Sequence, residues 1–252
     1  MEFILKQLVI SITLFLFLSN INAQNIELCC SANSGLFSFA KKYAVSSTLI
    51  HYDDLSNSGY TDNPFGSKAA ICYGLSFTIK EITQKNFIYG VDLAYEDLRS
   101  KVNIYKVIEY DGNQTYQYLA TGHTFLNNSF VNLYLFVGHR YKLKKVSFDI
   151  AGGTDIGYNL GSYEKGSAIA SNGNTYSTFA INRTTLSYIE IRPRIQISAI
   201  YKRCSLYIGY SYSVLDLLVS ANSQIKLENF TKDFRFGITY NLDLLIPGPI
   251  EE

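Results

Sequence analysis

Apolar and polar residues alternate along several segments of this chain, most clearly over residues 146–158. The even positions are bulky and apolar: Val146, Phe148, Ile150, Ile156 and Tyr158. The odd positions are acidic, polar or small: Ser147, Asp149, Ala151, Gly153, Asp155 and Gly157. Successive side chains of a β-strand point to opposite faces, so this segment has one apolar and one polar face. The small residues share the polar face, as expected inside a narrow barrel, and the large apolar side chains then point outward. This inversion is typical of a barrel surrounded by lipid.

The same period-2 alternation, bounded by turn residues, predicts eight strands. They are Lys41–Tyr52, Ala69–Ile82, Phe87–Arg99, Phe130–Lys142, Val146–Gly161, Leu186–Tyr201, Cys204–Leu217 and Lys232–Leu244. Each is longer than the roughly 9–11 residues that a tilted membrane strand requires. We therefore expect an all-β fold, an eight-stranded antiparallel up-and-down transmembrane β-barrel that occupies residues 41–244.

Short and long connectors alternate between these strands. The short ones are Thr83–Asn86, Leu143–Lys145 and Lys202–Arg203. The long ones are rich in Ser, Asn, Gly, Thr and Tyr: Asp53–Lys68, Ser100–Ser129, Ser162–Thr185 and Leu218–Thr231. Outer-membrane barrels have tight periplasmic turns and longer extracellular loops. The pattern therefore predicts four outside loops and places both termini in the periplasm. Pro193 falls within a predicted strand, where it cannot donate to a ladder, and predicts a bulge there.

Aromatic residues on the predicted outward faces gather near both ends of the strands. Near the short turns they are Tyr43, Phe87, Tyr141, Phe148, Tyr201 and Tyr240. Near the long connectors they are Tyr73, Tyr95, Tyr158, Tyr212 and Phe234. The outward residues between them are aliphatic, among them Leu75, Leu93, Leu135, Ile150 and Ile208. Two aromatic girdles around an aliphatic band predict two membrane–water interfaces. Tyrosine and phenylalanine also favour strands in general, but that preference alone does not place them at strand ends.

The N-terminal residues 1–23 have the features of a cleaved signal peptide. Lys6 precedes the apolar run Leu8–Leu18, which is too short to span a bilayer, and Ala23 ends a small-residue cleavage site. A buried helix or an uncleaved anchor is the alternative. We expect residues 24–40 to form a short periplasmic segment and residues 245–252 a periplasmic tail. Cys29 lies several residues beyond the cleavage site, which disfavours a lipoprotein, and the pairing of the four cysteines stays open.

The charge balance and the absence of known motifs exclude several kinds of function. The chain has 22 Lys and Arg against 21 Asp and Glu, which argues against nucleic-acid binding. No metal-binding or cofactor-binding motif appears, so we expect none. His51 and His123 lie in or near long connectors, and His139 faces lipid. No fixed spacing joins them to a serine and an aspartate, so we expect no enzyme activity.

The predicted inward face carries a balanced set of acids and bases. They are Lys80, Asp92, Glu96, Arg140, Asp149, Asp155, Glu190, Arg192, Arg194 and Arg235. The lumen of an eight-stranded barrel is just wide enough for side chains to fill it. Buried charges are tolerable when they are paired and hydrogen-bonded. We therefore expect a structural charge network that closes the lumen, with a narrow ion path as the alternative.

Three strand segments carry a resemblance to a known group of proteins. They are Gly138-His-Arg-Tyr, Gly209-Tyr-Ser-Tyr and the closing Phe234-Arg-Phe-Gly-Ile-Thr-Tyr. With the signal peptide, they resemble the small outer-membrane β-barrel proteins of Bacteroidota, the PorT-like group, with the architecture of OmpX- and OmpA-type barrels. Such chains often end on an aromatic residue of the last strand, whereas this one continues past Tyr240 to Glu252. The resemblance implies an accessory role in secretion.

The expected function is that of a non-enzymatic integral protein of the bacterial outer membrane. Its roles would be envelope structure, surface contact or assistance to secretion, and its partners would be outer-membrane lipids and a protein or surface ligand at the extracellular loops. The competing interpretation is a soluble, exported, lipocalin-like carrier of a small ligand. Such a carrier needs an apolar interior, which conflicts with inward arginines and aspartates.

Overall fold

The computed structural model describes residues 25–182, 188–216 and 228–242, and its regular elements are all strands. They are β1 (Asn25–Ala40), β2 (Ser47–Asp53), β3 (Ser58–Thr61), β4 (Lys68–Ile82), β5 (Phe87–Tyr110), β6 (Thr115–Leu143), β7 (Val146–Ala170), β8 (Thr175–Ile181), β9 (Ile189–Tyr201), β10 (Cys204–Tyr212) and β11 (Phe230–Asn241). No helix in the described part of the chain is long and apolar enough to cross a membrane.

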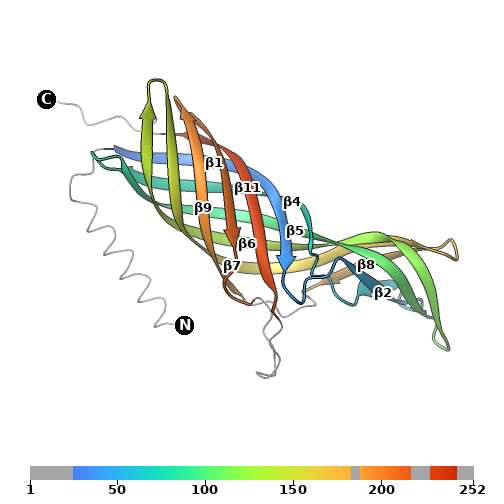
Figure 1. Cartoon of the computed structure of the whole chain (residues 1–252). Coiled ribbons are helices and arrows are strands. Elements are labelled where there is room, and N and C mark those ends of the chain that lie inside the picture. The colour runs from blue at the N-terminus through green and yellow to red at the C-terminus, as the bar shows by residue number, and fades with distance from the viewer. Residues whose placement is uncertain (1–24, 183–187, 217–227, 243–252) are drawn as a thin grey trace.

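Eight of these strands close into a ring by antiparallel pairing (Figure 1). The order around the ring is β1, β4, β5, β6, β7, β9, β10 and β11. The last strand returns to the first, since β11 pairs with β1 from Cys29↔Asn241 to Ala40↔Phe230. The predicted all-β, eight-stranded antiparallel up-and-down barrel is confirmed. The three short turns, which join β4–β5, β6–β7 and β9–β10, also lie where the sequence predicts them.

The first ring strand lies elsewhere than predicted. Residues 24–40, expected to be a periplasmic segment, contain β1, while the predicted strand Lys41–Tyr52 supplies only β2, outside the ring. The physical reason is the weak contrast between the two faces of β1. Ser31 is buried and the neighbouring Ala32 is exposed, so neither side chain is large or charged enough to mark its face. The barrel therefore begins at residue 25.

Two of the predicted long loops are largely strands. β5, β6 and β7 continue past the ring into the regions predicted as the connectors Ser100–Ser129 and Ser162–Thr185. There β2 pairs in parallel with β5, β3 pairs with β2, and β8 pairs with β7. We call this assembly of β2, β3, β8 and the outer parts of β5–β7 the extension. It projects from one end of the ring (Figure 1).

The ring and the extension bury different kinds of side chain. On the outside of the ring, large apolar residues are exposed, with Leu75 and Val137 each 66% exposed. The extension has its own apolar core of seven buried residues: Ile50, Tyr52, Ile104, Val107, Ala168, Ala170 and Tyr176. The extension is therefore packed like an ordinary water-soluble sheet, whereas the ring is not.

Pro193 lies within β9 without a bulge, so the predicted bulge is wrong. Pro193 is exposed and stands opposite Thr154 of β7, and neither ladder of β9 shows a register shift. The ladder between β9 and β10 runs from Cys204↔Tyr201 to Ser211↔Arg194, so it ends at the residue next to Pro193. Beyond the proline Val214 N still donates a hydrogen bond of 3.0 Å to the carbonyl oxygen of Ile191, so Pro193 interrupts this pairing without a bulge.

Candidate functional site

Two clusters of charged side chains lie inside the ring, and the first is close to the short turns. In this cluster Arg140 Nη1 lies 2.6 Å from Glu27 Oε1, and Arg140 Nε lies 2.7 Å from Asp149 Oδ1. Lys80 Nζ lies 3.1 Å from a carboxylate oxygen of each of the same two acids. Two cations and two carboxylates from β1, β4, β6 and β7 thus neutralise one another across this end of the ring.

The second cluster is centred on Arg235 of β11, whose side chain is 1% exposed. Its Nε and Nη2 each donate a hydrogen bond of 2.7 Å to Glu96. Nη1 lies 3.1 Å from Asp155 Oδ2, and Nη2 lies 2.8 Å from Asp233 Oδ2. Bidentate arginine–carboxylate pairs are among the strongest hydrogen-bonded contacts in proteins. One guanidinium therefore joins carboxylates of β5, β7 and β11 through the middle of the lumen.

Arg192 of β9 adds a second cation to this central cluster. Its Nη2 donates a hydrogen bond of 2.8 Å to Asn132 Oδ1. Its guanidinium nitrogens also lie 3.7 Å from Glu96 and 3.7 Å from Glu190. Asn132 in turn donates to Glu96 at 2.5 Å, so the amide bridges the arginine and the carboxylate. Every group in this contact set is fully buried or nearly so.

Arg194 and Asp92 lie where the central cluster borders the rest of the lumen. Arg194 Nη1 donates to Asp155 Oδ1 at 3.3 Å, and its guanidinium carbon lies 4.3 Å from the centre of the Tyr134 ring. Asp92 accepts a hydrogen bond of 2.7 Å from the Thr78 hydroxyl. Arginine stacked on an aromatic face gains a cation–π contact besides its ion pair.

The structure separates the ten sequence-predicted lumen residues into these groups. The cluster near the short turns contains Lys80, Arg140 and Asp149. The central cluster contains Glu96, Asp155, Glu190, Arg192, Arg194 and Arg235, and Asp92 stands beside it. All ten side chains are buried or nearly so inside the ring, with Lys80 the most accessible at 13%.

Three members of the network were not predicted from the sequence. Glu27 lies in β1, which was not recognised as a strand. Asp233 shares the face of Arg235 two residues away, so the parity used for Arg235 would have found it. Asn132 is uncharged, and only the three-dimensional packing shows that it bridges Arg192 and Glu96.

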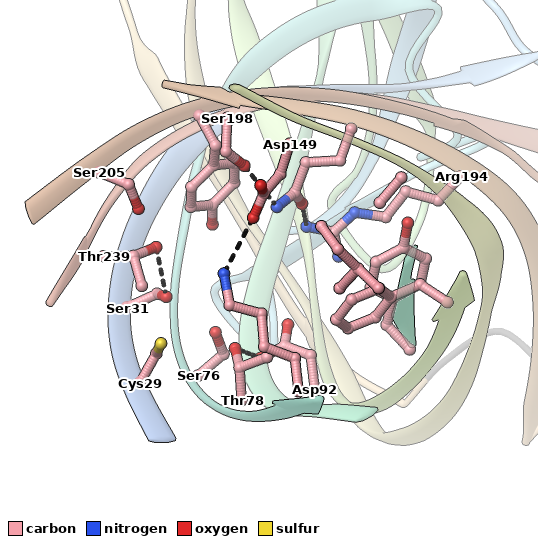
Figure 2. A pocket seen from close by; sticks show the side chains of 17 residues that line it. Cys29, Ser31, Ser76, Thr78, Asp92, Asp149, Arg194, Ser198, Ser205 and Thr239 are labelled. Atoms are coloured by element: carbon pink, nitrogen blue, oxygen red, sulfur yellow. Dashed lines mark hydrogen bonds and ion pairs between the residues drawn. The ribbon is translucent and has the colours of Figure 1, made fainter. Parts of the chain in front are cut away.

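A small cavity of about 50 Å³ lies between the two clusters (Figure 2). Hydroxyl groups line much of it, and Ser31 and Thr239 share a hydrogen bond of 2.8 Å across the β1–β11 seam. Asp92 and Arg194 are also among its lining residues, and Figure 2 shows them on different sides of it. One water needs roughly 10–15 Å³ of such volume, so this cavity has room for a few waters and for no drug-sized ligand.

Beyond the central cluster an aromatic layer closes the ring toward the extension. It consists of seven buried residues: Phe37, Phe39, Phe65, Cys72, Leu98, Leu126 and Phe130. The ring centroids of Phe39 and Phe65 are 5.2 Å apart, in an edge-to-face arrangement. Phe65 enters from the segment between β3 and β4, which is held by a 2.9 Å hydrogen bond from Phe39 N to the carbonyl oxygen of Gly66. Charge pairs and an apolar layer thus lie in series along the inside of the ring.

The histidines form no catalytic arrangement among the described residues. His51 Nε2 lies 3.8 Å from Asp62 Oδ1, and its ring stacks on Tyr60. His123 packs edge-on against Phe125, and His139 against Phe87. No three His, Cys, Asp or Glu side chains of the described residues are arranged to hold a metal ion. None of the four cysteines forms a disulfide, and Cys29 and Cys72 are buried while Cys30 and Cys204 are exposed.

No protein-family model and no curated protein matches this chain in sequence. Among solved structures, one match is Ail, the attachment invasion locus protein of Yersinia pestis, in complex with the heparin analogue sucrose octasulfate. It has a TM-score of 0.33 and 11% identity, covering 87% of this chain and 100% of Ail. Another is Neisserial surface protein A, with a TM-score of 0.34 and 10% identity, covering 86% of this chain and 99% of that protein. Both are eight-stranded outer-membrane β-barrel proteins.

Proposed function

We propose that this chain is a non-enzymatic integral protein of the bacterial outer membrane, exported through a cleaved signal peptide at residues 1–23. In this proposal the ring spans the bilayer with its short turns in the periplasm, and the extension stands outside the cell. The charge network and the aromatic layer close the lumen. The protein then acts through its outer surface, in surface contact, envelope structure or assistance to secretion of the PorT-like kind.

The observation that carries this proposal is the reversed polarity of the ring. Its interior buries charged groups such as Arg235 and Glu96, at 1% and 2% exposure, while its exterior exposes a belt of aliphatic side chains. In water such an exterior would be a very large apolar patch, far beyond the few hundred Å² that monomeric soluble proteins expose. In lipid the same exterior is the favoured one.

The two alternatives fit the interior less well. A lipocalin-like carrier needs an apolar cavity that holds a ligand, but the cavity in this ring measures about 50 Å³ and is lined mainly by polar groups. A channel needs a continuous aqueous path. In this ring such a path would have to pass Arg235, which lies 2.7 Å from Glu96, and then Phe65 and Phe130 of the aromatic layer.

The test is purification of the mature protein, residues 24–252, followed by electrophoresis in SDS with and without boiling. We expect extraction only with detergent, and a faster band for the unboiled, folded barrel. A monomer that stays soluble without detergent would contradict the membrane location. Planar-bilayer recordings of the same sample should show no stable conductance, and a large, steady conductance would replace the closed lumen by a channel.

A further inference from the structure

A group of basic and aromatic side chains covers the outer face of the extension next to the ring. Strand register places Lys101 of β5 opposite Phe125 of β6, and Phe125 opposite Lys165 of β7. One step nearer the ring, Arg99 stands opposite Asn127. Side chains of directly opposed residues lie on the same face of a sheet. Three cations from two strands are therefore gathered around one aromatic ring; we call Arg99, Lys101, Lys165 and Phe125 the basic patch.

The geometry around Phe125 shows how closely these groups converge. The guanidinium carbon of Arg99 lies 5.5 Å from the centre of the Phe125 ring, and Lys101 Nζ lies 5.9 Å from it. The His123 ring packs against the same phenylalanine at 5.1 Å. Arg99 is held in place by a hydrogen bond of 2.6 Å from its Nε to Asn127 Oδ1. Arg99 and Lys101 thus contact neighbours that carry no charge of opposite sign.

The patch has an excess of positive charge. Among the described residues, no carboxylate oxygen lies within 4.0 Å of the side-chain nitrogens of Lys68, Arg99, Lys101 or Lys165. Lys68 stands directly opposite Lys101, and like charges in this position destabilise a sheet. A carboxylate on this face of β5 is Asp97, which accepts a hydrogen bond of 2.9 Å from the Tyr73 hydroxyl. The excess of cations therefore favours an anionic ligand.

The level of the patch along the barrel indicates what kind of anion it meets. Tyr95 belongs to the outer aromatic girdle, and Arg99 follows it by four residues on the same face of β5. At about 3.3 Å per residue, this is roughly 13 Å along a tilted strand. Tyrosines of such girdles lie at the membrane–water interface. The patch therefore stands at the height of lipid headgroups and their phosphates.

An apolar groove adjoins the patch on the same outer face. It measures about 500 Å³ and is lined by Tyr95, Leu160, Tyr163, Phe179 and Ile181, with polar residues at its edge. Phe179 and Ile181 are 60% and 62% exposed, and Phe179 stands directly opposite Lys165. The groove is continuous with the lipid-facing belt through Tyr95 and Leu160. An acyl chain in this groove would have its headgroup beside the cations.

We propose that the basic patch and the adjoining groove form a binding site for a phosphorylated lipid of the outer leaflet. The phosphate lies among Arg99, Lys101 and Lys165, and an acyl chain lies along Leu160, Phe179 and Ile181. This inference rests on the proposed membrane location. It goes beyond that location because it assigns one flank of the extension to one chemical class of lipid.

The experiment compares two spin-labelled lipids around the protein in phosphatidylcholine vesicles. Electron spin resonance measures the motionally restricted fraction of labelled phosphatidic acid and of labelled phosphatidylcholine. Each basic residue near an anionic lipid contributes on the order of a several-fold preference, so we expect at least about a threefold preference for phosphatidic acid. In the variant Arg99→Gln/Lys101→Gln/Lys165→Gln this preference should disappear.

A matched control removes three cations from the other end of the barrel, in Lys142→Gln/Lys144→Gln/Lys145→Gln. This control should keep the preference, and an equal loss in both variants would overturn the site. Phe179→Ser should weaken the restriction of phosphatidic acid while leaving the SDS mobility of the folded barrel unchanged. Inorganic phosphate at millimolar concentration should not displace the labelled lipid, and displacement would overturn the assignment to a lipid. Failure to enter vesicles would contradict the membrane location itself, whereas entry with equal restriction of both labels would contradict only this site.

Discussion

The ring and the extension are built from the same strands but have opposite polarity, as β5 shows along its length. In the ring, the inward residues of β5 are polar or small: Asp92, Ala94 and Glu96. In the extension, its inward residues are apolar: Val102 and Ile104. On the outward face the order is reversed, because Leu93 and Tyr95 are followed by Arg99 and Lys101. The exchange takes place within a few residues near Asp97.

The same rule of burial explains both regions if their surroundings differ. In each region the outside matches the solvent, and the inside holds the remaining side chains at high packing density. The apolar core around Val107 resembles that of a water-soluble sheet, which fits the proposed position of the extension outside the membrane. The charged interior around Arg235 is tolerated because each cation has carboxylates within reach. In the proposed orientation, the change of polarity along β5 lies at the outer surface of the membrane.

The largest effect should follow from breaking the central charge cluster of the ring. In Arg235→Ala, Glu96, Asp155 and Asp233 lose their shared cation, and removal of one partner from a buried pair costs about 3–5 kcal/mol. The measurement is urea unfolding of the protein refolded in lipid vesicles. Lys142→Ala, at an exposed position near a short turn, is the control and should change stability by less than about 0.5 kcal/mol. Equal values for both variants would mean that Arg235 is solvated in an open lumen.

A somewhat smaller effect should separate the two outer surfaces. Leu135→Arg places a charge in the aliphatic belt and should cost roughly 2–4 kcal/mol, as charges near the bilayer midplane do. Ile150→Arg, on the neighbouring strand, should cost a similar amount. Tyr105→Arg makes the same kind of change on the outside of the extension and should be nearly neutral. If all three substitutions had similar costs in vesicle unfolding, the proposed boundary near Asp97 would be wrong.

Removal of a single methyl group tests the two regions more gently. Ile50 is fully buried in the core of the extension, so Ile50→Val should cost about 0.5–1.5 kcal/mol. Ile150→Val removes the same group from a side chain that is 43% exposed on the ring and should cost much less. The local effect of Ile50→Val is measured by amide hydrogen exchange in β2 and β3. Faster exchange there, with unchanged exchange in β9 and β10, is the expected result, and faster exchange throughout would mean that both regions unfold together.

The smallest effect concerns the far tip of the extension, between β5 and β6. The Asp111 carboxylate accepts hydrogen bonds from the backbone N–H groups of Gln114 and Asn113, and these contacts lower the pKa of Asp111 from 3.8. Because the folded-state pKa is lowered, the ionised Asp111 carboxylate stabilises the turn at pH values above the ordinary pKa of aspartate. This stabilisation is lost as the pH falls through the folded-state pKa. NMR shifts of the two amides should therefore titrate with a midpoint below 3.8, and Asp111→Asn should abolish the titration. A midpoint at or above 3.8 would contradict the capped turn.

The fold of the ring was largely predictable because its strands have large apolar side chains on one face and polar or small ones on the other, which gives a strong period-2 pattern. The chain segments of β4–β7 and β9–β11 were found from that pattern, and so were ten inward charges. β1 was missed because the side chains in its middle, from Cys30 to Gly35, are small on both faces, so that alternation carries little contrast there. β2 lies mostly within a predicted strand, whereas β8 fell in the predicted connector Ser162–Thr185, because the Ser and Thr residues of this segment resemble a loop composition.

The candidate sites were predictable to different degrees. Lumen charges could be found by parity, but their division into two clusters depends on the tilt and register of eight strands, which no local pattern encodes. The basic patch was not predicted at all. Arg99 ended a predicted strand, while Lys101, Phe125 and Lys165 fell in predicted loops, and only the pairing of the extended β5, β6 and β7 brings these four together.

The seam between β1 and β11 sets the order in which this chain can fold. The Ser31 and Thr239 hydroxyls, which meet there at 2.8 Å, are separated by 208 positions in the chain. Hairpins such as β6–β7 close over a few residues, whereas the seam closes almost the whole chain, and such distant contacts form slowly. The ring therefore cannot be completed until its final strand has been synthesised. Until then β1 presents an unpaired edge that other chains could join, so the unfinished chain must be kept apart from its copies until the ring closes.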